Sequence, residues 1–339
     1  MRRRLALGVA GLLALAAAPA TALLPRGDVR FVDVPAVTLP LAPPEALPVP
    51  AQAAPPRRVA MLASPEPDAG RGPPVTLDPQ LIEATALGNL PRKAADGRGP
   101  LGHYARPVSQ GCSRPCVGVV IGGLGLADRI TERALTLPGE VGLSFSPYAR
   151  AAAWQERARA AGHEVLLGLP LAAELPAVDD RGPLAIGPGA AAPAMRAALL
   201  RVLAQGGGYV ALDGSAGAFA ADPARFAPLA QELGGRGLGL IEIGGQSLAA
   251  PSAQAALPYA GGAVPIDLDP APAAVELALG EVLAVARAQG RAIAVAQPLP
   301  GTLDRLAAWI ARLPEEGLAL APPSALLAAG AGAVAGRDG

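Results

Sequence analysis

Polar side chains follow several apolar runs of this chain, at the points where strands are expected to end. Five of them are candidate cleft residues: Asp213, Glu242, Gln297, Ser146 and Ser215. A pair of carboxylates can serve as general acid and general base on a glycan. Hydroxyls and an amide can hydrogen-bond the many donors and acceptors of a sugar chain. These residue types are therefore suited to acid–base chemistry or to hydrogen bonding of a polar ligand at the strand ends.

Two more carboxylates, Asp267 and Asp269, stand after a later apolar run and allow two interpretations. They could join Asp213 or Glu242 in acid–base work. They could also cap the helix expected to follow, because Asp269 precedes a proline and an acid beside proline suits the free N–H groups of a helix start. The sequence leaves both roles open.

The chain is poor in metal ligands. It has two histidines, His103 and His163, and two cysteines, Cys112 and Cys116. No His-rich metal site can be built from this stock, so we expect no metal and no cofactor. The cysteines stand four apart, which suits a disulfide on a helical turn or in a tight loop but not across an extended strand, and an oxidising compartment would allow it to form. Two unpaired small apolar residues are the alternative.

Two short motifs invite enzymatic interpretations and do not sustain them. The G-x-G-x-x-G pattern from Gly123 has Asp128 where a third small residue is needed, which argues against a nicotinamide-binding loop. The run Asp-Gly-Ser-Ala-Gly at 213–217 resembles a nucleophile elbow but begins with Asp in place of Gly. Its Ser215 would also need a base. His163 instead follows a predicted helix end, where we expect it to contact the helix C-terminus.

Charge and composition limit the classes of function further. The 339 residues carry 28 basic and 28 acidic side chains, and this balance gives no electrostatic reason to bind nucleic acid. Hydrophobic residues make up 51% of the chain and aromatic residues only 3%, so the core must be built mainly from Ala, Leu and Val.

The first residues have the pattern of an export signal. Residues 1–22 join three leading arginines to an apolar run, and Ala20-Thr21-Ala22 fits a small-x-small cleavage site. The run approaches the length that spans a bilayer, so a cleaved signal peptide and a retained inner-membrane anchor both stay open. Residues 23–89 are rich in Pro and Ala, which predicts a disordered linker. We therefore expect a periplasmic protein.

From about residue 111 onward, apolar runs alternate with amphipathic or Ala-rich segments. The runs predict strands at 116–121, 140–145, 164–169, 209–212, 238–243, 264–266, 292–296 and 318–320. The segments between them predict helices at 127–135, 151–161, 193–204, 223–233, 271–289 and 302–312. This alternation indicates a parallel sheet, open or closed into a barrel. In such folds functional sites gather at the carboxyl ends of the strands.

Several of these blocks resemble one known family. VGVVIGGLG at 117–125, AGHEVLLGLPL at 161–171 and RAIAVAQPLPG at 291–301 are similar to segments of the divergent polysaccharide deacetylases, relatives of the NodB-type carbohydrate esterases. The resemblance implies a deacetylase domain at 116–328 with a lead-in at 90–115, followed by a Gly/Ala-rich tail at 329–339. It also implies an irregular seven-stranded (β/α) barrel of the NodB-like glycoside hydrolase/deacetylase type.

The same resemblance implies that the family's chemistry is missing here. In the family a set of carboxylate and histidine side chains holds a divalent metal that activates water. Glu242 occupies the position of an aspartate in the family and is the one conservative replacement. Gln297 occupies the position of a histidine. The remaining positions of the pattern have lost their polar side chains: Gly122, Gly123, Gly168, Gly214 and Ala218.

Three classes of function remain open. The first is an exported, non-hydrolytic protein of cell-envelope glycan metabolism that binds polysaccharide or peptidoglycan, or acts as a scaffold. The second is an active carbohydrate deacetylase or hydrolase with a rearranged, metal-free carboxylate site. The third is a structural domain whose cleft is filled. If a glycan is bound, we expect Asp213, Glu242 and Gln297 to contact it.

Overall fold

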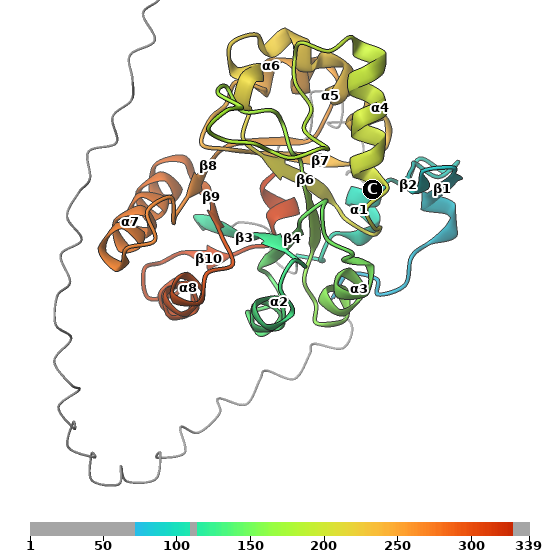
Figure 1. Ribbon diagram of the computed structural model, residues 1–339. Helices are drawn as coiled ribbons and strands as arrows, with labels where there is room; N and C mark the ends of the chain where they lie inside the picture. Colours follow the sequence, from blue (N-terminus) through green and yellow to red (C-terminus); the bar gives the residue numbers. More distant parts are fainter. Residues whose placement is uncertain (1–71, 109–113, 328–339) are drawn as a thin grey trace, which may run out of the picture. The chain divides into compact units, whose positions relative to one another are not determined.

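Seven parallel strands close into a barrel in the computed structural model, which describes residues 72–108 and 114–327 (Figure 1). The sheet order runs from β3 to β9, and β9 pairs back onto β3 to close the ring. The strands are β3 (Cys116–Leu124), β4 (Gly142–Phe145), β5 (Val165–Gly168), β6 (Ala211–Gly214), β7 (Gly239–Ile243), β8 (Tyr259–Pro265) and β9 (Arg291–Ala296). A two-residue strand, β10 (Ala319–Leu320), pairs with the start of β3. The predicted irregular (β/α) barrel is confirmed.

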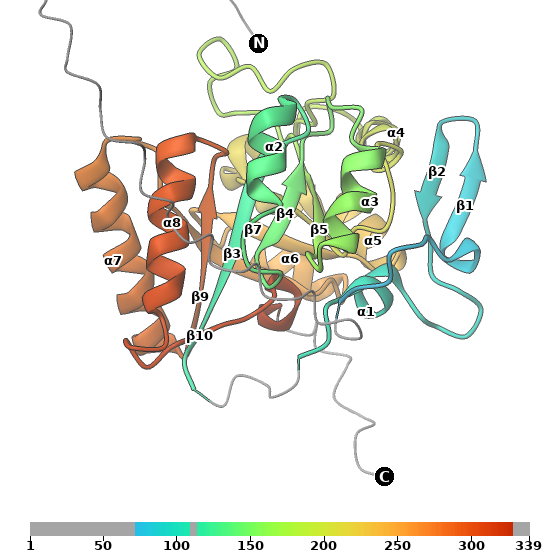
Figure 2. The same cartoon turned by 90° about the horizontal axis from the view of Figure 1, so that it is seen from below.

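Helices cover the outside of the barrel (Figure 2). They are α2 (Asp128–Ala134), α3 (Ala152–Ala160), α4 (Ala192–Leu203), α5 (Ala227–Gly235), α6 (Ala249–Gln254), α7 (Pro272–Gln289) and α8 (Pro300–Arg312), with the 3-10 turns η2 (Gly217–Ala220) and η3 (Pro223–Phe226) before α5. The helix expected at 223–233 is thus divided between η3 and α5. The sequence did not predict α6, because six residues are too few for an apolar periodicity to be recognised. Within the described ranges, no helix has both the length and the apolarity to cross a membrane.

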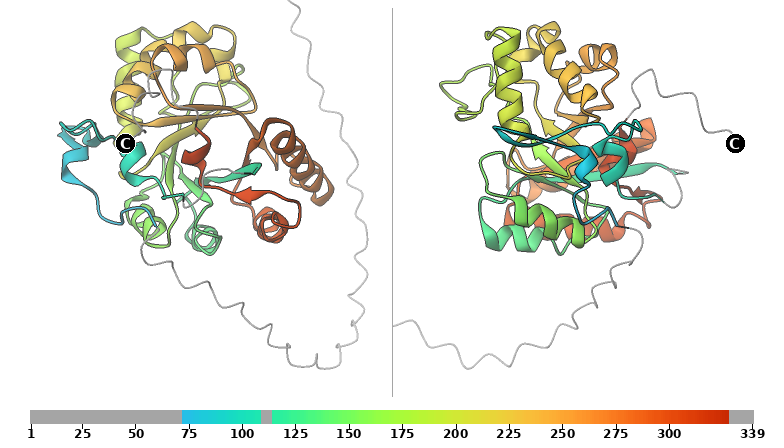
Figure 3. Two further views of the ribbon diagram at one scale, coloured as in Figure 1. Left: turned by 180° about the vertical axis from the view of Figure 1, so that it is seen from behind. Right: turned by 90° about the vertical axis from the view of Figure 1, so that its right-hand side faces the viewer.

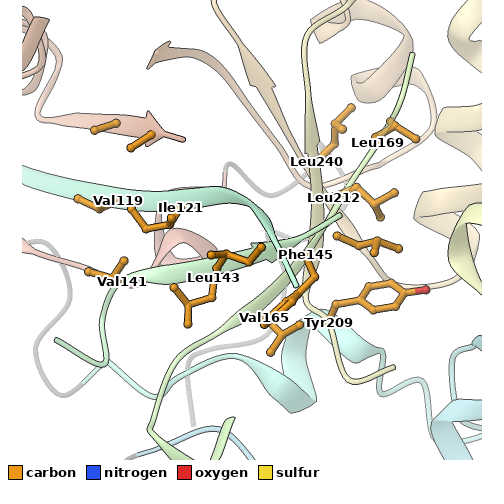
Figure 4. Packing of buried hydrophobic residues seen from close by; sticks show 14 of the residues in the cluster. Val119, Ile121, Val141, Leu143, Phe145, Val165, Leu169, Tyr209, Leu212 and Leu240 are labelled. Atoms are coloured by element: carbon orange, nitrogen blue, oxygen red, sulfur yellow. The ribbon is translucent and has the colours of Figure 1, made fainter. Parts of the chain in front are cut away.

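Alternate strand residues build two apolar layers. Val119 and Ile121 of β3 pack outward with Leu143 and Phe145 of β4 against the helices (Figure 4). Val120, between them, belongs to a separate interior cluster. This alternation follows from the two-residue repeat of a strand. Both faces of β3 and β4 are therefore buried, as expected for a parallel sheet covered by helices, whereas β8 is only partly buried over residues 259–262.

The C-terminal turn η4 (Pro323–Leu326) plugs the barrel at the amino ends of its strands, and Figure 1 shows this turn in red inside the ring. Three interior glycines leave it room. A Cβ at Gly118 would lie 2.7 Å from Leu326 Cδ1, and one at Gly142 would lie 2.6 Å from Pro323 Cγ. A Cβ at Gly239 would collide with Leu327. Larger residues at these positions would exclude the plug.

One buried carboxylate, Glu164, ties the plug to the rest of the fold. Its Oε1 accepts hydrogen bonds from the Arg106 N–H at 2.9 Å and from the Ser324 hydroxyl, and its Oε2 accepts one from the Ser324 N–H at 2.9 Å. Burial raises the pKa of the Glu164 carboxyl, and the hydrogen bonds from Ser324 and Arg106 act against that rise. The lead-in, the start of β5 and the C-terminal turn therefore meet on one side chain.

The lead-in is folded from earlier in the chain than expected. It contains η1 (Pro79–Leu81), the antiparallel hairpin of β1 (Ile82–Thr85) and β2 (Gly88–Pro91), and α1 (Pro100–Tyr104). The hairpin lies on the side of the barrel opposite α7 and α8 (Figures 1 and 3). The predicted linker end at residue 89 falls inside β2, so that boundary is wrong. Buried Leu81 and Leu90 and the 3.0 Å ion pair between Arg98 and Asp78 hold the lead-in in place.

The predictions for the chain ends and for Cys112 lie outside the described residues. These are the segments 1–22 and 329–339 and the part of the linker before residue 72. Cys116, the first residue of β3, is disulfide-bonded.

Replacing Glu164 by alanine should lower the free energy of unfolding by about 2–4 kcal/mol, because the Arg106 and Ser324 N–H groups would lose their buried acceptor. Urea denaturation followed by circular dichroism measures this. Glu156→Ala is the matched control, since Glu156 is exposed on α3, and it should stay within about 0.5 kcal/mol of the wild type. Equal losses in both variants would contradict the role given to Glu164.

Candidate functional site

A hydrogen-bonded pair, Asp213 and Ser144, lies near the carboxyl ends of the strands. The Ser144 hydroxyl, from β4, donates a hydrogen bond to Asp213 Oδ1, from β6. Ser144 is 1% exposed and Asp213 is 6% exposed. Between their strands lies β5, whose Gly168 is paired with Asp213 in the sheet and carries no side chain there. The hydrogen bond between Ser144 and Asp213 therefore spans the intervening strand on the inner side of the barrel.

Burial changes the acidity of Asp213. Loss of water contact raises its pKa to about 6, and the hydrogen bond from Ser144 acts against this rise. A carboxyl group with this pKa can accept or release a proton near neutral pH. It can also accept a hydrogen bond from a ligand hydroxyl. Asp213 is thus the described carboxylate best suited to chemistry or binding at this end of the barrel.

Asp267 and Gln297 form a second feature at the same end. The Gln297 N–H donates to both oxygens of Asp267, at 3.1 and 3.0 Å, which fixes the loop after β9 against the loop after β8. Burial raises the pKa of Asp267. The Gln297 side chain is exposed, and its Oε1 lies 3.5 Å from where a Cβ at Gly123 would stand. Asp269 accepts from the Ala271 N–H at 2.9 Å, so of its two open roles the structure places it at the start of α7.

Glu242 does not lie in the cleft as expected. It is fully buried, and its Oε1 accepts the Ser247 N–H at 2.9 Å while its Oε2 accepts the Leu248 N–H at 2.8 Å and the Tyr259 hydroxyl at 2.6 Å. The neighbouring Ile241 belongs to the interior cluster, so the alternation of the strand turns Glu242 outward. Glu242 orders the loop between β7 and α6. Its alternation relative to Ile241 was the sequence signal that could have shown that its side chain turns outward.

The remaining candidates contribute mainly to loop structure. Ser146 is buried, and its hydroxyl accepts the Tyr148 N–H at 3.3 Å. Ser215 is half-buried beside Asp213 in the chain. Ala218 donates its N–H to the Ala172 carbonyl at 2.8 Å, which joins the loops after β5 and β6. Figure 2 shows the long loop after β5 in yellow-green at the carboxyl ends of the strands.

The positions that hold the metal in the family carry no ligating side chains here, and they differ in whether a side chain would fit. At Gly122 a Cβ would have room, its nearest neighbours being the Ala296 carbonyl at 3.8 Å and Asp213 Oδ2 at 4.0 Å. At Gly214 a Cβ would lie 2.6 Å from the Leu169 carbonyl oxygen, so no side chain fits without moving the end of β5. In residues 72–108 and 114–327, no three His, Cys, Asp or Glu side chains are grouped to hold a metal ion. The divalent metal that the resemblance implies therefore has no ligand set in this part of the chain.

The two histidines lie away from these groups. His163 Nδ1 lies 2.9 Å from the Val141 carbonyl and Nε2 lies 3.3 Å from the carbonyl of Leu135, at the C-terminal end of α2. Its N–H donates to Ala158 of α3, so it contacts two helix ends. This is the amino end of β5, whereas Ser215 follows the carboxyl end of β6, so the two residues form no nucleophile–base pair. His103 lies in the lead-in, 3.9 Å from Asp78.

Comparisons with known proteins agree with this fold. The sequence model of a family described as divergent polysaccharide deacetylase matches residues 119–327. Among solved structures, the crystal structure of an uncharacterized protein from Agrobacterium tumefaciens C58 is similar, with 29% identity and a TM-score of 0.66. That similarity covers 71% of this chain and 100% of the other. No curated protein matches the chain.

Two glycine substitutions test whether a side chain fits at two of the ligand positions. Gly214→Ala should lower the free energy of unfolding by about 1–3 kcal/mol, because the added methyl group meets the Leu169 carbonyl. Gly122→Ala should change it by no more than about 0.5 kcal/mol, because nothing lies closer than 3.8 Å. Chemical denaturation of both variants tests this. Equal stability of the two would show that Gly214 is not sterically required.

Asp213→Asn should remove a pH-dependent loss of stability. A folded-state pKa of about 6, above the ordinary 3.8, means that the contribution of Asp213 is fully present below pH 3.8 and is lost as the pH rises through about 6. Asparagine does not ionise. The stability of the variant relative to the wild type should therefore grow by about 2.5 kcal/mol between pH 4 and pH 8.

Denaturation curves at several pH values measure this difference. The control is Asp222→Asn, because Asp222 is exposed and its side chain makes no capping hydrogen bond. Its stability relative to the wild type should stay constant over the same range. A flat profile for Asp213→Asn would contradict the raised pKa.

Proposed function

Because the chain belongs to the divergent polysaccharide deacetylase family, we propose that it is an exported, non-hydrolytic member that binds a cell-envelope glycan. The observation that carries this proposal is the state of the family's ligand positions. Gly122, Gly123 and Gly168 have no side chain that could bind a metal. At Gly214 the Leu169 carbonyl oxygen leaves no room for a side chain. What remains at the strand ends is suited to binding.

Metal-dependent hydrolysis is disfavoured because the ligand positions have no metal-binding side chains. Metal-free hydrolysis is disfavoured because most carboxylates near the strand ends are already engaged in hydrogen bonds. A two-carboxylate mechanism needs a general acid and a general base on either side of the bond that is cleaved. Asp213 could serve as one of them. Glu242 has both oxygens engaged by Ser247, Leu248 and Tyr259, and Asp267 holds the Gln297 N–H. Asp213 is thus left without a second free carboxylate among the groups described.

The polar and aromatic groups at this end of the barrel suit a sugar chain, with Asp213 already hydrogen-bonded to Ser144 through Oδ1. The Asp213 carboxylate, the exposed Gln297 amide and the half-buried Ser215 hydroxyl offer acceptors and donors. The exposed ring of Tyr148 offers an apolar face. Family membership makes a polysaccharide or peptidoglycan the ligand to test first. Glu242 is not among the contacts proposed here, because its oxygens are occupied.

An active deacetylase or hydrolase with a metal-free site is the second candidate. The raised pKa of Asp213 favours it, since a carboxyl group that titrates near pH 6 is suited to proton transfer. Turnover would then depend on Asp213 alone or on a group supplied by the substrate.

Chitooligosaccharides and peptidoglycan fragments should bind the purified protein weakly, with Kd near a millimolar or below, and without release of acetate. Calorimetric titration measures binding, and an acetate assay on the same samples measures turnover. Gln297→Ala and Asp213→Asn should each weaken binding about tenfold. The exposed Asp222→Asn should not change it.

Undetectable binding at millimolar ligand, or binding unaffected by both substitutions at the strand ends, would rule out the glycan site. Acetate release that disappears in Asp213→Asn would favour the hydrolase instead. The assay therefore separates the two candidate functions in one set of samples.

Export is proposed on two features of the chain. The arginines and apolar run of residues 1–22 have the form of a signal peptide or membrane anchor. The disulfide at Cys116 is typical of an oxidising compartment. Fusing residues 1–60 to alkaline phosphatase, which is active only outside the cytoplasm, should give an active reporter. A fusion that stays inactive while being fully expressed would contradict a periplasmic location.

A further inference from the structure

Large apolar side chains stand exposed on the loops that follow the barrel strands. Val178 and Leu268 are the most open, at 84% and 85% exposure. The full set, which we call the apolar arc, consists of Leu126, Tyr148, Leu175, Val178, Leu268 and Leu299. Leaving such surface in water forgoes about 25 cal/mol for each Å² that a partner would cover. Exposed apolar surface of this kind, gathered on one face, is typical of interaction sites.

The members of the apolar arc follow one another around the barrel. They lie on the loops after β8, β9, β3, β4 and β5, and the closed sheet sets these strands side by side in that order. In the described ranges, the loops after β6 and β7 carry no exposed large apolar side chain. The other such side chains in these ranges are Val75, Leu87 and Val108 in the lead-in and Leu277 on α7. The arc is therefore a feature of one end of the barrel.

Hydrogen bonds hold the arc loops after β4 and β5 in place. The Tyr148 hydroxyl accepts the Leu184 N–H at 3.2 Å and donates to the Arg181 carbonyl. Farther along the loop after β5, the carbonyls of Pro188 and Ala190 accept hydrogen bonds from the guanidinium of Arg225 in η3, at 2.7 and 2.9 Å. A surface fixed in this way loses little conformational entropy when a partner binds.

The charges on the arc loops indicate what kind of partner fits. Asp179 and Arg181 form an ion pair at 2.5 Å. The other exposed charged side chains on these loops are three carboxylates, Glu174, Asp180 and Asp269, and one arginine, Arg150. An excess of carboxylates disfavours a second copy docked by the same face and disfavours an anionic membrane. It favours a surface that carries basic side chains.

We infer that the apolar arc is the docking surface for a protein partner that presents apolar side chains flanked by basic ones. Leu268 and Val178 would be buried in the contact, and Asp180, Asp269 and Glu174 would face the partner's basic groups. The apolar arc borders the proposed glycan site and shares Tyr148 with it. Val178 and Leu268 are not among the proposed glycan contacts, so substitutions at these two positions test the docking surface without removing a glycan contact.

In-cell cross-linking of the full-length chain tests the inference. A photoreactive p-benzoylphenylalanine replaces Val178 or Leu268 in the organism that encodes the protein. Two exposed apolar positions outside the arc, Leu87 and Leu277, are the controls, at 50% and 79% exposure. Both arc positions should give an adduct with the same protein, and neither control should.

The cross-linked partner is then purified and titrated against the full-length protein. The double substitution Val178→Ser and Leu268→Ser should weaken binding about tenfold or more, whereas Leu277→Ser should not change it. Raising the salt from about 50 to about 500 mM should also weaken binding, because the flanking charges would be screened.

Four results would overturn the inference. They are no protein adduct from either arc position, adducts from all four positions alike, adducts only with a second copy of the chain or with lipid, and a purified partner whose binding is unaffected by the double substitution. Each is distinct from a failed glycan titration, which concerns Asp213 and Gln297.

Discussion

The pairing of β3 with β9 is the constraint on which the rest of the structure depends. Six consecutive residue pairs, from Cys116 with Arg291 to Ile121 with Ala296, join the first and last strands of the barrel. Because this pairing closes the sheet, the carboxyl ends of all seven strands form one ring, and the amino ends form another that the C-terminal turn fills. The closed ring also buries both faces of most of its strands, while β8 is only partly buried. A core of small aliphatic side chains is sufficient for this, which accounts for the low aromatic content.

The same barrel is compatible with the proposed loss of metal-dependent hydrolysis. A parallel (β/α) barrel is stabilised mainly by its two apolar layers and its plug, to which the glycines at the strand ends contribute no side chain. Side chains there can be lost without loss of the fold. Gly122 and Gly168 leave room, while Gly214 has become part of the close contact with Leu169. Asp213 keeps a buried partner in Ser144, and Glu242 holds a loop. At the carboxyl ends of the strands, Gly122 and Gly168 thus have room for a side chain and Gly214 does not. The carboxylates there are held in hydrogen bonds within the protein.

The sequence predicted the barrel well because each strand is a continuous apolar run bounded by Gly, Pro or polar residues. It placed Asp213 and Gln297 at strand ends for the same reason. The hairpin at 82–91 was missed because its strands have only four residues each and follow a Pro-rich segment. The closure of Gly214 was also beyond sequence reasoning, since it depends on a carbonyl 45 positions earlier in the chain. The role of Glu242 depends on the backbone N–H groups of a loop, which no side-chain pattern reveals.

The central claim is that the ring of strand ends can no longer hold the metal on which the family's deacetylation depends. Elemental analysis of the purified full-length protein tests it most directly, after incubation with excess zinc, cobalt or manganese and exhaustive dialysis. Structural and catalytic sites hold such ions tightly enough to survive this treatment. The account predicts less than about one ion for every ten chains. A retained ion at about one per chain, lost on Asp213→Asn, would contradict it.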